Sequence, residues 1–444
     1  MKKRALIIFT RVPYPGETKT RLMPYFTPKQ CRNLHICFLK DIAKMCEKTD
    51  ADIFICHTPE DKDKILHHIF GEKTEYFLQV GEGLGERMYA AIDAVLKKGY
   101  EACILMGTDV PEVRKEDIQR AFELLESKDV VFAPVADGGY YLVGMKTARK
   151  EVFEQKTYGH ANVLEDTMFG LRTRNISVGL IEEKYDIDTR EDICLFRERM
   201  RKNPVFQKSE TGKYLMRTSK ISIIVPVYNE EKTIKALQEQ LHPLREKCEI
   251  LFVDGGSTDR TLEYMDPAFR LLHSEKGRAK QMNLGACEST GDILFFLHCD
   301  SELPERPLEQ IRAIMKDYKV GCFGIAFHSK NFFMFTCRVI SNHRIKDRKV
   351  MFGDQGIFID RELFFEVGMF PDLPLMEDYQ FSLTLKERGE KIGIAKKRIY
   401  TSERRFPAGT IPKLKEMWKM NRLRKRYRDG VDIHTIARMY EDVR

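Results

Sequence analysis

Apolar and polar residues follow one another in the same order in both halves of the chain. Continuous apolar runs at 4–9 (RALIIF) and 221–228 (ISIIVPVY) predict strands that are buried on both faces. Each run is followed, after a polar loop, by a segment whose apolar residues recur every three or four positions, at 34–45 and 234–241. That spacing is typical of an amphipathic helix. Strands that alternate with such helices predict parallel sheets covered by helices on both faces.

Two further apolar runs end in an aspartate that is soon followed by a proline. Residues 102–111 (ACILMGTDVP) contain Asp109, and residues 292–304 (DILFFLHCDSELP) contain Asp300. Ligands of parallel α/β sheets bind beyond the carboxyl ends of the strands, which is where both aspartates are expected to lie. The pattern therefore predicts an α/β fold of two tandem domains, each a mostly parallel sheet flanked by helices.

The length of the chain agrees with two domains. Its 444 residues exceed what a single hydrophobic core usually supports. We assign the first domain to 1–200 and the second to 220–444. The basic and weakly periodic residues 201–219 are expected to form the linker between them.

The composition excludes several classes of protein. With 43% hydrophobic and 32% charged residues, the chain is not typical of disordered proteins. No apolar run approaches the roughly 18 residues that cross a bilayer, and the first one is too short for a signal peptide, so we expect a cytoplasmic protein. The 11 cysteines are scattered without a CxxC pair, which argues against a disulfide framework and a zinc ribbon. The net charge of +8 favours anionic ligands, such as nucleotides or a phospholipid surface.

Seven motifs succeed one another in the C-terminal half: VPVYNEE, VDGGSTDRT, KGRAKQMN, LHCDS, GDQGIF, MEDYQF and TSERR. In this order they resemble the family 2 glycosyltransferases over about residues 219–430, and most of all the transferase 2 branch associated with radical-SAM and selenium-domain gene clusters. The resemblance implies a GT-A fold of the Rossmann-like kind. It also implies transfer of a sugar from a nucleotide sugar to a hydroxyl of a small-molecule or lipid acceptor, by a single inverting displacement.

The same resemblance implies roles for individual residues. Asp378 is the expected general base, and Asp300 the expected ligand of Mg²⁺ or Mn²⁺, which prefer oxygen ligands. The expected donor-binding residues are Pro226, Tyr228, Asn229, Glu230, Asp254, Gly256, Arg278, Arg404 and Arg405. Two alternatives stay open: Asp378 and its neighbour Glu377 only cap a helix, and the two arginines of TSERR form only a solvated charge run.

Three adjacent residues at 298–300 could each bind a metal. Successive side chains of a strand point to opposite faces, so His298 and Asp300 share one face and Cys299 points into the other layer. Cys299 is therefore expected in the core. Many glycosyltransferases of this fold have another Asp at the position of His298, so Asp300 remains the one hard-oxygen ligand, with His298 beside the donor.

The N-terminal half has a different set of motifs, RVPYPGETKTRL, QVGEGLGERM, GTDVP, APVADGGYYLVG and DIDTREDI. Over about residues 3–200 they resemble the transferase 1 family (DUF2064) of the same gene clusters, a relative of nucleotidyltransferases that is also GT-A-like. The resemblance implies Asp109 and Asp188 as ligands of one divalent metal. The residues expected to bind nucleotide phosphates or shape the pocket are Arg11, Gly16, Lys19, Arg21, Asp137 and Gly138. The alternative is a domain without activity that only supports its neighbour.

Residues 413–428 (KLKEMWKMNRLRKRYR) predict a basic amphipathic helix that contains the only tryptophan, Trp418. One interpretation is a peripheral contact with anionic lipid at the inner membrane surface. The other is a helix that packs on the catalytic domain with a solvated outer face. A nucleic-acid role would need interleaved aromatic residues or a recognisable module, and the sequence contains neither.

These observations favour a bifunctional enzyme of the glycosyltransferase type. Its C-terminal domain would transfer the sugar with the help of a metal, and its N-terminal domain would be a nucleotidyl- or glycosyl-transferase-like partner. Two alternatives remain: both halves are glycosyltransferases, or the whole chain is a membrane-surface or scaffold protein with inactive sites.

Overall fold

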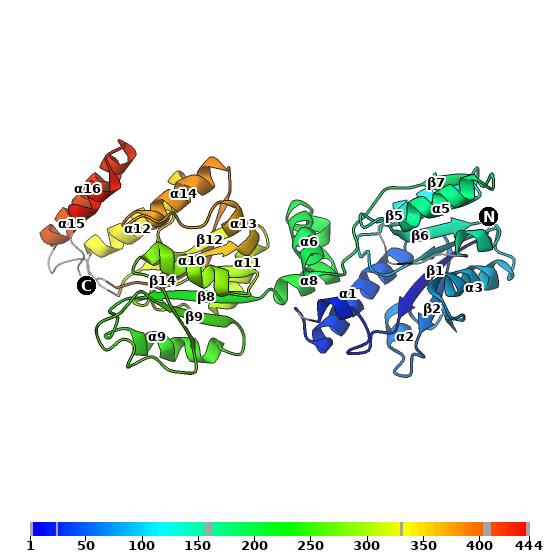
Figure 1. Ribbon diagram of the computed structural model, residues 1–444, viewed down its shortest axis with the longest axis horizontal. Helices are drawn as coiled ribbons and strands as arrows, with labels where there is room; N and C mark the ends of the chain where they lie inside the picture. The colour runs from blue at the N-terminus through cyan, green and yellow to red at the C-terminus, as the bar shows by residue number, and fades with distance from the viewer. Residues whose placement is uncertain are drawn as a thin grey trace. The chain divides into compact units, whose positions relative to one another are not determined.

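The computed structural model describes residues 3–23, 25–154, 158, 162–328, 332–402 and 410–440. The contacts divide the chain into two compact units, Met1–Leu215 and Met216–Arg444. Each unit is built around one seven-stranded sheet (Figure 1). The predicted segment 201–219 lies almost entirely in helices, and the division falls near its end.

The N-terminal sheet has the strand order β3-β2-β1-β4-β6-β5-β7. Only β6 runs antiparallel to its neighbours β4 and β5, and the other pairs are parallel. The strands are β1 (Arg4–Arg11), β2 (Asp52–Thr58), β3 (Glu75–Leu78), β4 (Ala102–Met106), β5 (Val130–Pro134), β6 (Tyr140–Met145) and β7 (Val178–Leu180).

Helices cover both faces of this sheet. One core joins Leu6 and Ile8 of β1 to α1 and α4, and the other joins Ala5 and Ile7 to α3 and α5. Alternate residues of one strand therefore pack into opposite layers, which is why residues 5–9 (ALIIF) are all apolar. The helices are α1 (Pro28–Cys46), α2 (Ile65–Phe70), α3 (Leu84–Leu96), α4 (Lys115–Leu125), α5 (Val163–Arg172), α6 (Arg190–Lys202), α7 (Pro204–Lys208) and α8 (Glu210–Arg217), with 3₁₀ turns η1 (Thr20–Leu22) and η2 (Lys150–Val152).

The segment predicted as the linker is attached to the N-terminal unit. The first backbone N–H groups of α8, those of Glu210 and Thr211, both donate to the carboxylate of Asp41 on α1 at 2.8 Å. Lys44 forms an ion pair with Glu210 at 2.9 Å, and the Tyr214 hydroxyl donates to a backbone carbonyl at the start of α1. A carboxylate at a helix N-terminus accepts from N–H groups that otherwise have no partner.

The C-terminal sheet repeats the design in the order β10-β9-β8-β11-β13-β12-β14, with β13 antiparallel to β11 and β12. Its strands are β8 (Ile221–Val227), β9 (Glu249–Asp254), β10 (Arg270–His273), β11 (Ile293–Phe296), β12 (Val320–Ala326), β13 (Ile357–Asp360) and β14 (Ile392–Tyr400). Its helices are α9 (Ile234–Leu241), α10 (Arg278–Glu288), α11 (Pro307–Met315), α12 (Phe332–Arg348), α13 (Arg361–Glu366), α14 (Glu377–Glu387), α15 (Thr410–Arg428) and α16 (Ile433–Arg438), with 3₁₀ turns η3 (His242–Leu244) and η4 (Gly353–Gln355).

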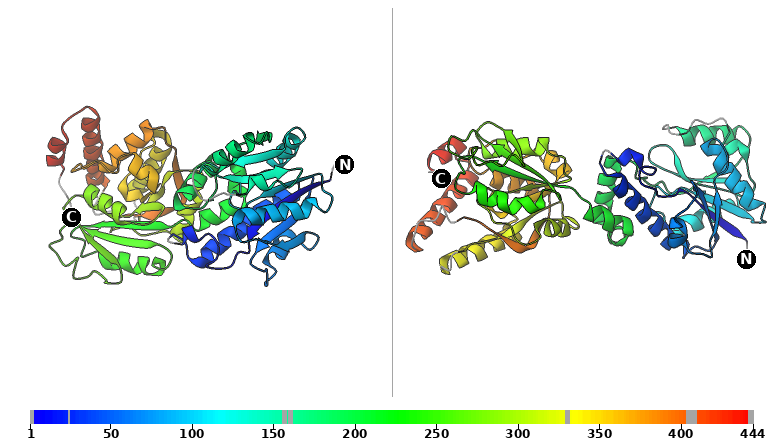
Figure 2. Two further views of the ribbon diagram at one scale, coloured as in Figure 1. Left: turned by 45° about the vertical axis from the view of Figure 1, so that its right-hand side comes forward. Right: turned by 90° about the horizontal axis from the view of Figure 1, so that it is seen from below.

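Within each unit the same layers of helix, sheet and helix are visible from other directions (Figure 2). The central strands β1 and β4, and likewise β8 and β11, run parallel and end at the same edge of their sheet. The predicted fold class, two tandem α/β domains that each have a mostly parallel sheet flanked by helices, is confirmed.

Candidate functional sites

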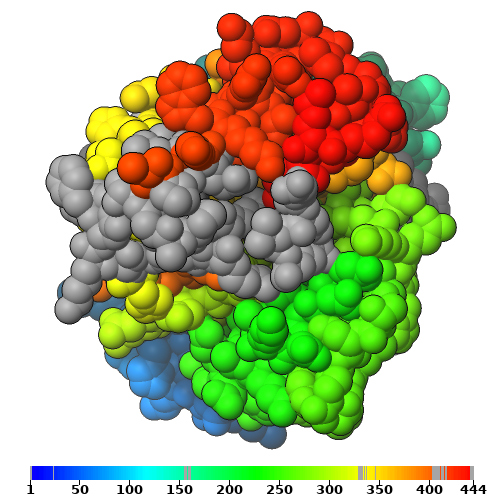
Figure 3. Space-filling model, turned by 90° about the vertical axis from the view of Figure 1, so that its left-hand side faces the viewer, coloured from blue at the N-terminus to red at the C-terminus, as the bar shows by residue number. Residues whose placement is uncertain are grey.

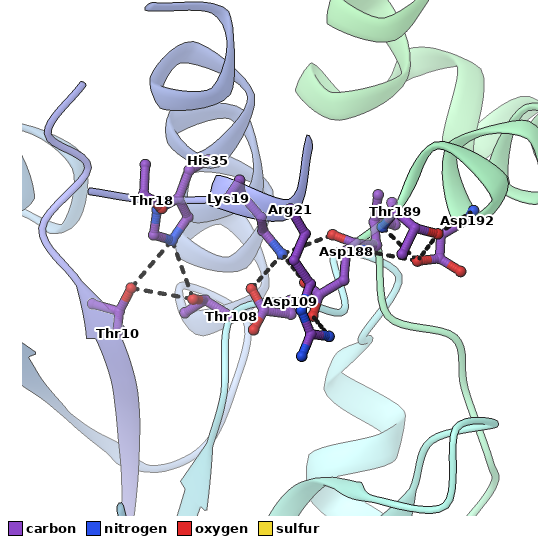
Figure 4. Close-up of polar contacts among 11 residues, drawn as sticks. Thr10, Thr18, Lys19, Arg21, His35, Thr108, Asp109, Asp188, Thr189 and Asp192 are labelled. Carbon is purple, nitrogen blue, oxygen red and sulfur yellow. Dashed lines mark hydrogen bonds and ion pairs between the residues drawn. The ribbon is translucent and has the colours of Figure 1, made fainter. Parts of the chain in front are cut away.

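The N-terminal unit brings one cation and two carboxylates together at the edge where β1 and β4 end. The Lys19 Nζ lies 2.5 Å from Asp109 Oδ1 and 2.9 Å from Asp188 Oδ1 (Figure 4). Its ammonium also donates to the carbonyl oxygen of Ile187 at 2.7 Å. The Lys19 side chain is 4% exposed, whereas that of Asp109 is 53% exposed. The group is therefore an open-topped cluster with the cation at its base.

The charges of this cluster stabilise one another. Burial alone would lower the pKa of Lys19, but the carboxylates of Asp109 and Asp188 outweigh that effect and raise it. Loss of water would likewise raise the pKa of Asp109, and Lys19 holds it below its usual value. At neutral pH Lys19 is therefore a charged ammonium and Asp109 an ionised carboxylate.

The two aspartates that were predicted to share a metal do converge on one cation position, which the Lys19 ammonium holds. No group of three or more His, Cys, Asp or Glu side chains with metal-binding geometry occurs within the described ranges. The chemistry of two carboxylates fits Mg²⁺ or Mn²⁺, which often bind to one or two protein oxygens and take other ligands from phosphates and water. The metal role of Asp109 and Asp188 stays a prediction.

The other predicted residues of this unit lie on surrounding loops. Arg21 approaches Asp188 at 3.6 Å with an exposed side chain, and Arg11 is exposed and donates to the Glu17 carbonyl. Gly16 has a φ of 86° and Gly138 a φ of 88°, values that glycine adopts readily. Arg11, at the end of β1, and Arg21, two residues after Lys19, are therefore both exposed near the cluster.

Asp137 belongs to a second acidic group close to Asp188. Its carboxylate accepts the N–H of Gly139 and so closes the predicted turn. Burial and the charges of Asp137, Asp188 and Asp192 raise the pKa of Asp186 to about 6. The turn at 137 and the loop at 186–188 are therefore near enough to interact electrostatically.

A buried histidine that lies behind this cluster was not identified from the sequence. His35, on α1, contacts the Thr18 hydroxyl through Nδ1 at 2.6 Å and the hydroxyls of Thr10 and Thr108 through Nε2 at 3.3 and 3.2 Å (Figure 4). Burial lowers its pKa to about 4, so the ring is neutral at pH 7. Its place next to Leu34, within the apolar repeat of the predicted helix, could have indicated that His35 is buried.

In the C-terminal unit, the carboxylate of Asp254 organises the loop after β9. It is 1% exposed and accepts the backbone N–H groups of Gly256 and Ser257 and the Ser257 hydroxyl. Gly256 has a φ of 84°, as the tight turn requires. Asp254 therefore shapes the predicted donor loop from beneath.

The loop after β8 is bonded to the loop after β9. The Asn229 side chain accepts the N–H of Thr258 at 2.8 Å, and the backbone N–H of Glu230 donates to the Thr261 hydroxyl at 2.7 Å. Pro226 is half-buried near the end of β8. These contacts bring the first two motifs of the C-terminal half to one place.

Two side chains complete this junction. The Lys276 ammonium lies 4.4 Å from the centre of the Tyr228 ring and donates to its hydroxyl. Gln281 was not predicted: its buried amide donates to the carbonyls of Val227 and Val253 at 2.7 Å each. The amide therefore links the ends of β8 and β9 to α10.

An ion pair joins the N-terminal ends of α10 and α14. The Arg278 guanidinium contacts Glu377, whose side chain is 2% exposed. Burial would lower the pKa of Arg278, but Glu377 and Asp378 raise it. In the structure this arginine, predicted to bind the donor, thus forms an ion pair with a carboxylate next to the predicted base.

Asp378 is fixed by the backbone. The N–H groups of Gly353 and Tyr379 donate to its two oxygens at 2.8 and 2.7 Å. A Cβ on Gly353 would meet the His298 ring at 2.5 Å, so His298, Gly353 and Asp378 lie in close contact. The predicted base therefore sits beside the end of β11.

Asp300 is half-buried in the turn after β11. Cys299 is buried and accepts the Thr233 hydroxyl at 3.6 Å, so it packs inward as expected. Arg404 and Arg405 lie outside the described residues. The role of Asp300 as a metal ligand stays a prediction.

Comparison with known proteins places this geometry in context. Residues 41–160 match the family described as "Uncharacterized protein conserved in bacteria (DUF2064)", and residues 222–368 match "Glycosyl transferase family 2". The chain joins a DUF2064 region to a glycosyl transferase family 2 region. The predicted resemblance of both halves is thereby confirmed, and the units are called the DUF2064 unit and the family 2 unit below.

The curated relatives include glycosyltransferases and a nucleotidyltransferase. An "Uncharacterized glycosyltransferase" of Haemophilus influenzae is 26% identical over 37% of this chain and 61% of its own length. A 2-phospho-L-lactate guanylyltransferase of Methanocaldococcus jannaschii is 26% identical over 39% of this chain and 75% of its own. The chain spans less than two thirds of the length of the glycosyltransferases that it matches first.

A solved structure from Desulfovibrio desulfuricans G20 is also similar to this chain. It is described as a "putative nucleotide-diphospho-sugar transferase" and is 30% identical, with a TM-score of 0.46 over 48% of this chain and 94% of that one.

The basic helix α15 packs on the family 2 unit. Leu423 of α15 and Ile436 of α16 are buried against Phe352 and Tyr379. Figure 3 shows both helices, in orange-red and red, together at the top of one face. On the outer side, Trp418 is 73% and Ile411 69% exposed. No helix within the described ranges is long and apolar enough to cross a membrane.

Residues of α15, together with Met439 after α16, line a groove of about 550 Å³. It combines apolar and basic side chains, namely Ile411, Lys415, Trp418, Lys419, Arg422, Leu423, Arg426 and Met439. One side of the basic helix therefore packs inward, and the membrane contact of the other side stays a prediction.

We predict that His35 makes the DUF2064 unit sensitive to acid. Its pKa is about 4 in the folded chain and near 6.5 when unfolded, so the unfolded chain takes up the proton first as the pH falls. Between pH 6.5 and 4 the free energy of unfolding should fall by about 3 kcal/mol. Hydrogen exchange of β1 amides, corrected for intrinsic rates, measures this loss.

The variant His35→Gln should flatten this pH dependence, because the proton uptake of the unfolded chain is removed. His68→Gln, at an exposed position on α2, is the matched control and should keep the dependence. An unchanged profile in His35→Gln would contradict the assignment.

Proposed function

We propose that the family 2 unit transfers a sugar from a nucleotide sugar to an acceptor hydroxyl. The observation that carries the proposal is the placement of Asp378. Two backbone N–H groups orient its carboxylate beside the end of β11. The match of 222–368 to glycosyl transferase family 2 supports the same reaction. An oriented carboxylate within reach of a bound hydroxyl is what a general base requires.

The reaction proposed is a single displacement with inversion. The acceptor oxygen attacks the anomeric carbon while Asp378 accepts the hydroxyl proton, and the bond to the nucleoside diphosphate breaks with its electron pair on the phosphate oxygen. Arg278 and Glu377 act as positioning residues, because their ion pair holds the start of α14 against α10. Without that contact the carboxylate of Asp378 would lose its fixed orientation.

The donor is proposed to bind over the joined loops after β8 and β9. The side-chain oxygens of Asn229 and Asp254 accept hydrogen bonds from the backbone of these loops. The base and ribose would therefore contact the exposed backbone of the loops and Tyr228. Asp300 would contribute one oxygen to Mg²⁺ or Mn²⁺, and such a cation neutralises charge on the departing diphosphate. Its other ligands would be phosphate oxygens and water.

For the DUF2064 unit we propose a nucleotidyl-transferase-like activity. The cluster of Lys19, Asp109 and Asp188 supports catalysis rather than a purely supporting role, because a scaffold has no need of three gathered charges at the carboxyl ends of its strands. The guanylyltransferase among the relatives agrees with it. Two active units would place consecutive steps on one chain.

A peripheral membrane contact is a second proposal for the family 2 unit. The exposed Trp418 and Ile411 lie among the lysines and arginines of the groove on α15. Apolar side chains surrounded by cations suit the boundary between headgroups and acyl chains of an anionic bilayer.

Asp378→Asn should lower the turnover of a UDP- or GDP-sugar by about a hundredfold or more, because the proton acceptor is removed from an otherwise intact site. Release of nucleoside diphosphate in the presence of Mn²⁺ measures the rate. Asp372→Asn, at an exposed position, is the control and should behave as wild type. Full activity in Asp378→Asn would refute the role of Asp378 as general base. If Mn²⁺ still stimulated the turnover of Asp300→Ala, the role of Asp300 as metal ligand would be refuted.

In the DUF2064 unit, Asp188→Asn should reduce pyrophosphate release from nucleoside triphosphates with a phosphorylated hydroxy acid by about a hundredfold, a typical effect of losing one electrostatic group. Asp166→Asn, exposed on α5, serves as the control. If wild-type protein released no pyrophosphate from any triphosphate, the supporting role would be preferred.

Trp418→Ala should weaken sedimentation with phosphatidylglycerol vesicles, since the most exposed apolar anchor of the groove is lost. Phe169→Ala removes an equally exposed aromatic from the other unit and should change nothing. Equal sedimentation of all three proteins would exclude the membrane contact.

A further inference from the structure

Two arginines from different helices meet at a single aromatic ring beside Asp378. The guanidinium carbon of Arg344, on α12, lies 4.0 Å from the centre of the Phe352 ring, and that of Arg424, on α15, lies 4.5 Å from it. Phe352 is buried and precedes Gly353, whose N–H binds Asp378. The arginines are thus next to the proposed base. Arg344 belongs to no motif recognised in the sequence, and Arg424 was noted only as part of the basic segment 413–428.

The two guanidinium groups carry like charges and lie close together, so they repel each other. Burial and the charge of Arg424 lower the pKa of Arg344 to about 10, although Asp354 and Asp378 act in the opposite direction. Burial also lowers the pKa of Arg424. Like charges in a region with little water repel each other strongly, so the pair is costly unless an anion joins it.

The hydrogen bonds of the pair are incomplete. Arg424 donates one N–H to the Asn421 side chain at 3.2 Å. Within the described ranges, the Nε atoms of both Arg344 and Arg424 are buried without a hydrogen-bond partner. A buried donor without a partner loses the free energy of its bond to water, which makes such a group a candidate for a ligand contact.

A phosphate group matches these features. Guanidinium groups bind phosphate oxygens through paired, charge-assisted hydrogen bonds, and two of them can hold one dianion. We propose that Arg344 and Arg424 bind a phosphate group of the acceptor and so place its hydroxyl at Asp378. The proposal rests on the sugar transfer proposed above and names the class of its acceptor, a phosphorylated alcohol.

The location separates this site from the donor. The loops proposed to bind the nucleotide follow β8 and β9, whereas the arginines interact with Asp354 and Asp378 near the start of α14. The neighbouring contacts hold α15 in place: the hydroxyl of Tyr427 donates to the Gln380 side chain at 2.8 Å. The basic helix thereby supplies one half of the acceptor site.

The test is calorimetric titration of the full chain with two matched pairs of probes. Glycerol 3-phosphate is paired with glycerol, and dihexanoyl phosphatidic acid with dihexanoylglycerol. We expect at least one phosphorylated probe to bind and its neutral match not to bind. Binding of the lipid probe alone would assign the phosphate to a lipid acceptor, and binding of both to the phosphate itself.

Arg344→Gln and Arg424→Gln should each lower the affinity for the phosphorylated probe by about tenfold or more, because each removes a charge-assisted hydrogen bond. Arg388→Gln, at an exposed position just after α14, should change affinity less than about twofold. Arg344→Lys retains a charge without the planar fork and should recover part of the affinity. Circular dichroism and the melting temperature verify that each variant is folded.

Three results would overturn the proposal. Neither phosphorylated probe binds, or Arg388→Gln loses as much affinity as the two arginine variants, or those variants weaken the binding of UDP and GDP as strongly as that of the probes. The last result would assign the pair to the donor. Turnover of nucleotide sugars without probe binding would refute only the acceptor site. Probe binding that depends on both arginines, without turnover, would refute the sugar transfer and leave an anion site.

Discussion

The parallel pairing of the central strands is the constraint on which both sites depend. Parallel neighbours end at one edge of a sheet, so loops that are far apart in sequence must meet there. In the DUF2064 unit the pairing of β1 with β4 brings the loop of Lys19 to Asp109. In the family 2 unit the pairing of β8 with β9 and β11 brings Asn229 near Asp254 and the turn of Asp300. The antiparallel strands β6 and β13 widen each sheet beside this edge.

The two units use the same edge with different chemistry. The DUF2064 unit collects a buried ammonium between two carboxylates and supports it with a neutral histidine network. The family 2 unit instead stabilises the start of α14 with an arginine–glutamate pair, so that the adjacent carboxylate of Asp378 is oriented by backbone N–H groups. A common fold therefore supports two separate electrostatic arrangements, as expected when function resides in the side chains at a site and not in the fold.

The C-terminal helix connects the proposed acceptor chemistry with the surface. Its inner side contributes Arg424 next to the proposed base, while Trp418 on its outer side is exposed among basic residues. The two proposals for α15, an acceptor phosphate and an anionic surface, therefore concern opposite sides of this helix. Of the two interpretations that the sequence left open, the structure shows the packing of the helix, and the membrane contact stays a proposal.

Local patterns in the sequence were sufficient to predict the two α/β units, their apolar strands, and the aspartates Asp109 and Asp300 that follow two of these strands. The reason is that a strand buried on both faces must be a continuous apolar run. The order of the motifs was sufficient for the family of each half. The tertiary structure alone decided that Lys19 occupies the position between Asp109 and Asp188, that Arg278 contacts Glu377, and that Arg344 and Arg424 share Phe352. It also decided that α7 and α8 pack on α1 through Asp41. These pairings join residues that are distant in the chain, and a charged side chain has no periodicity that reveals its partner.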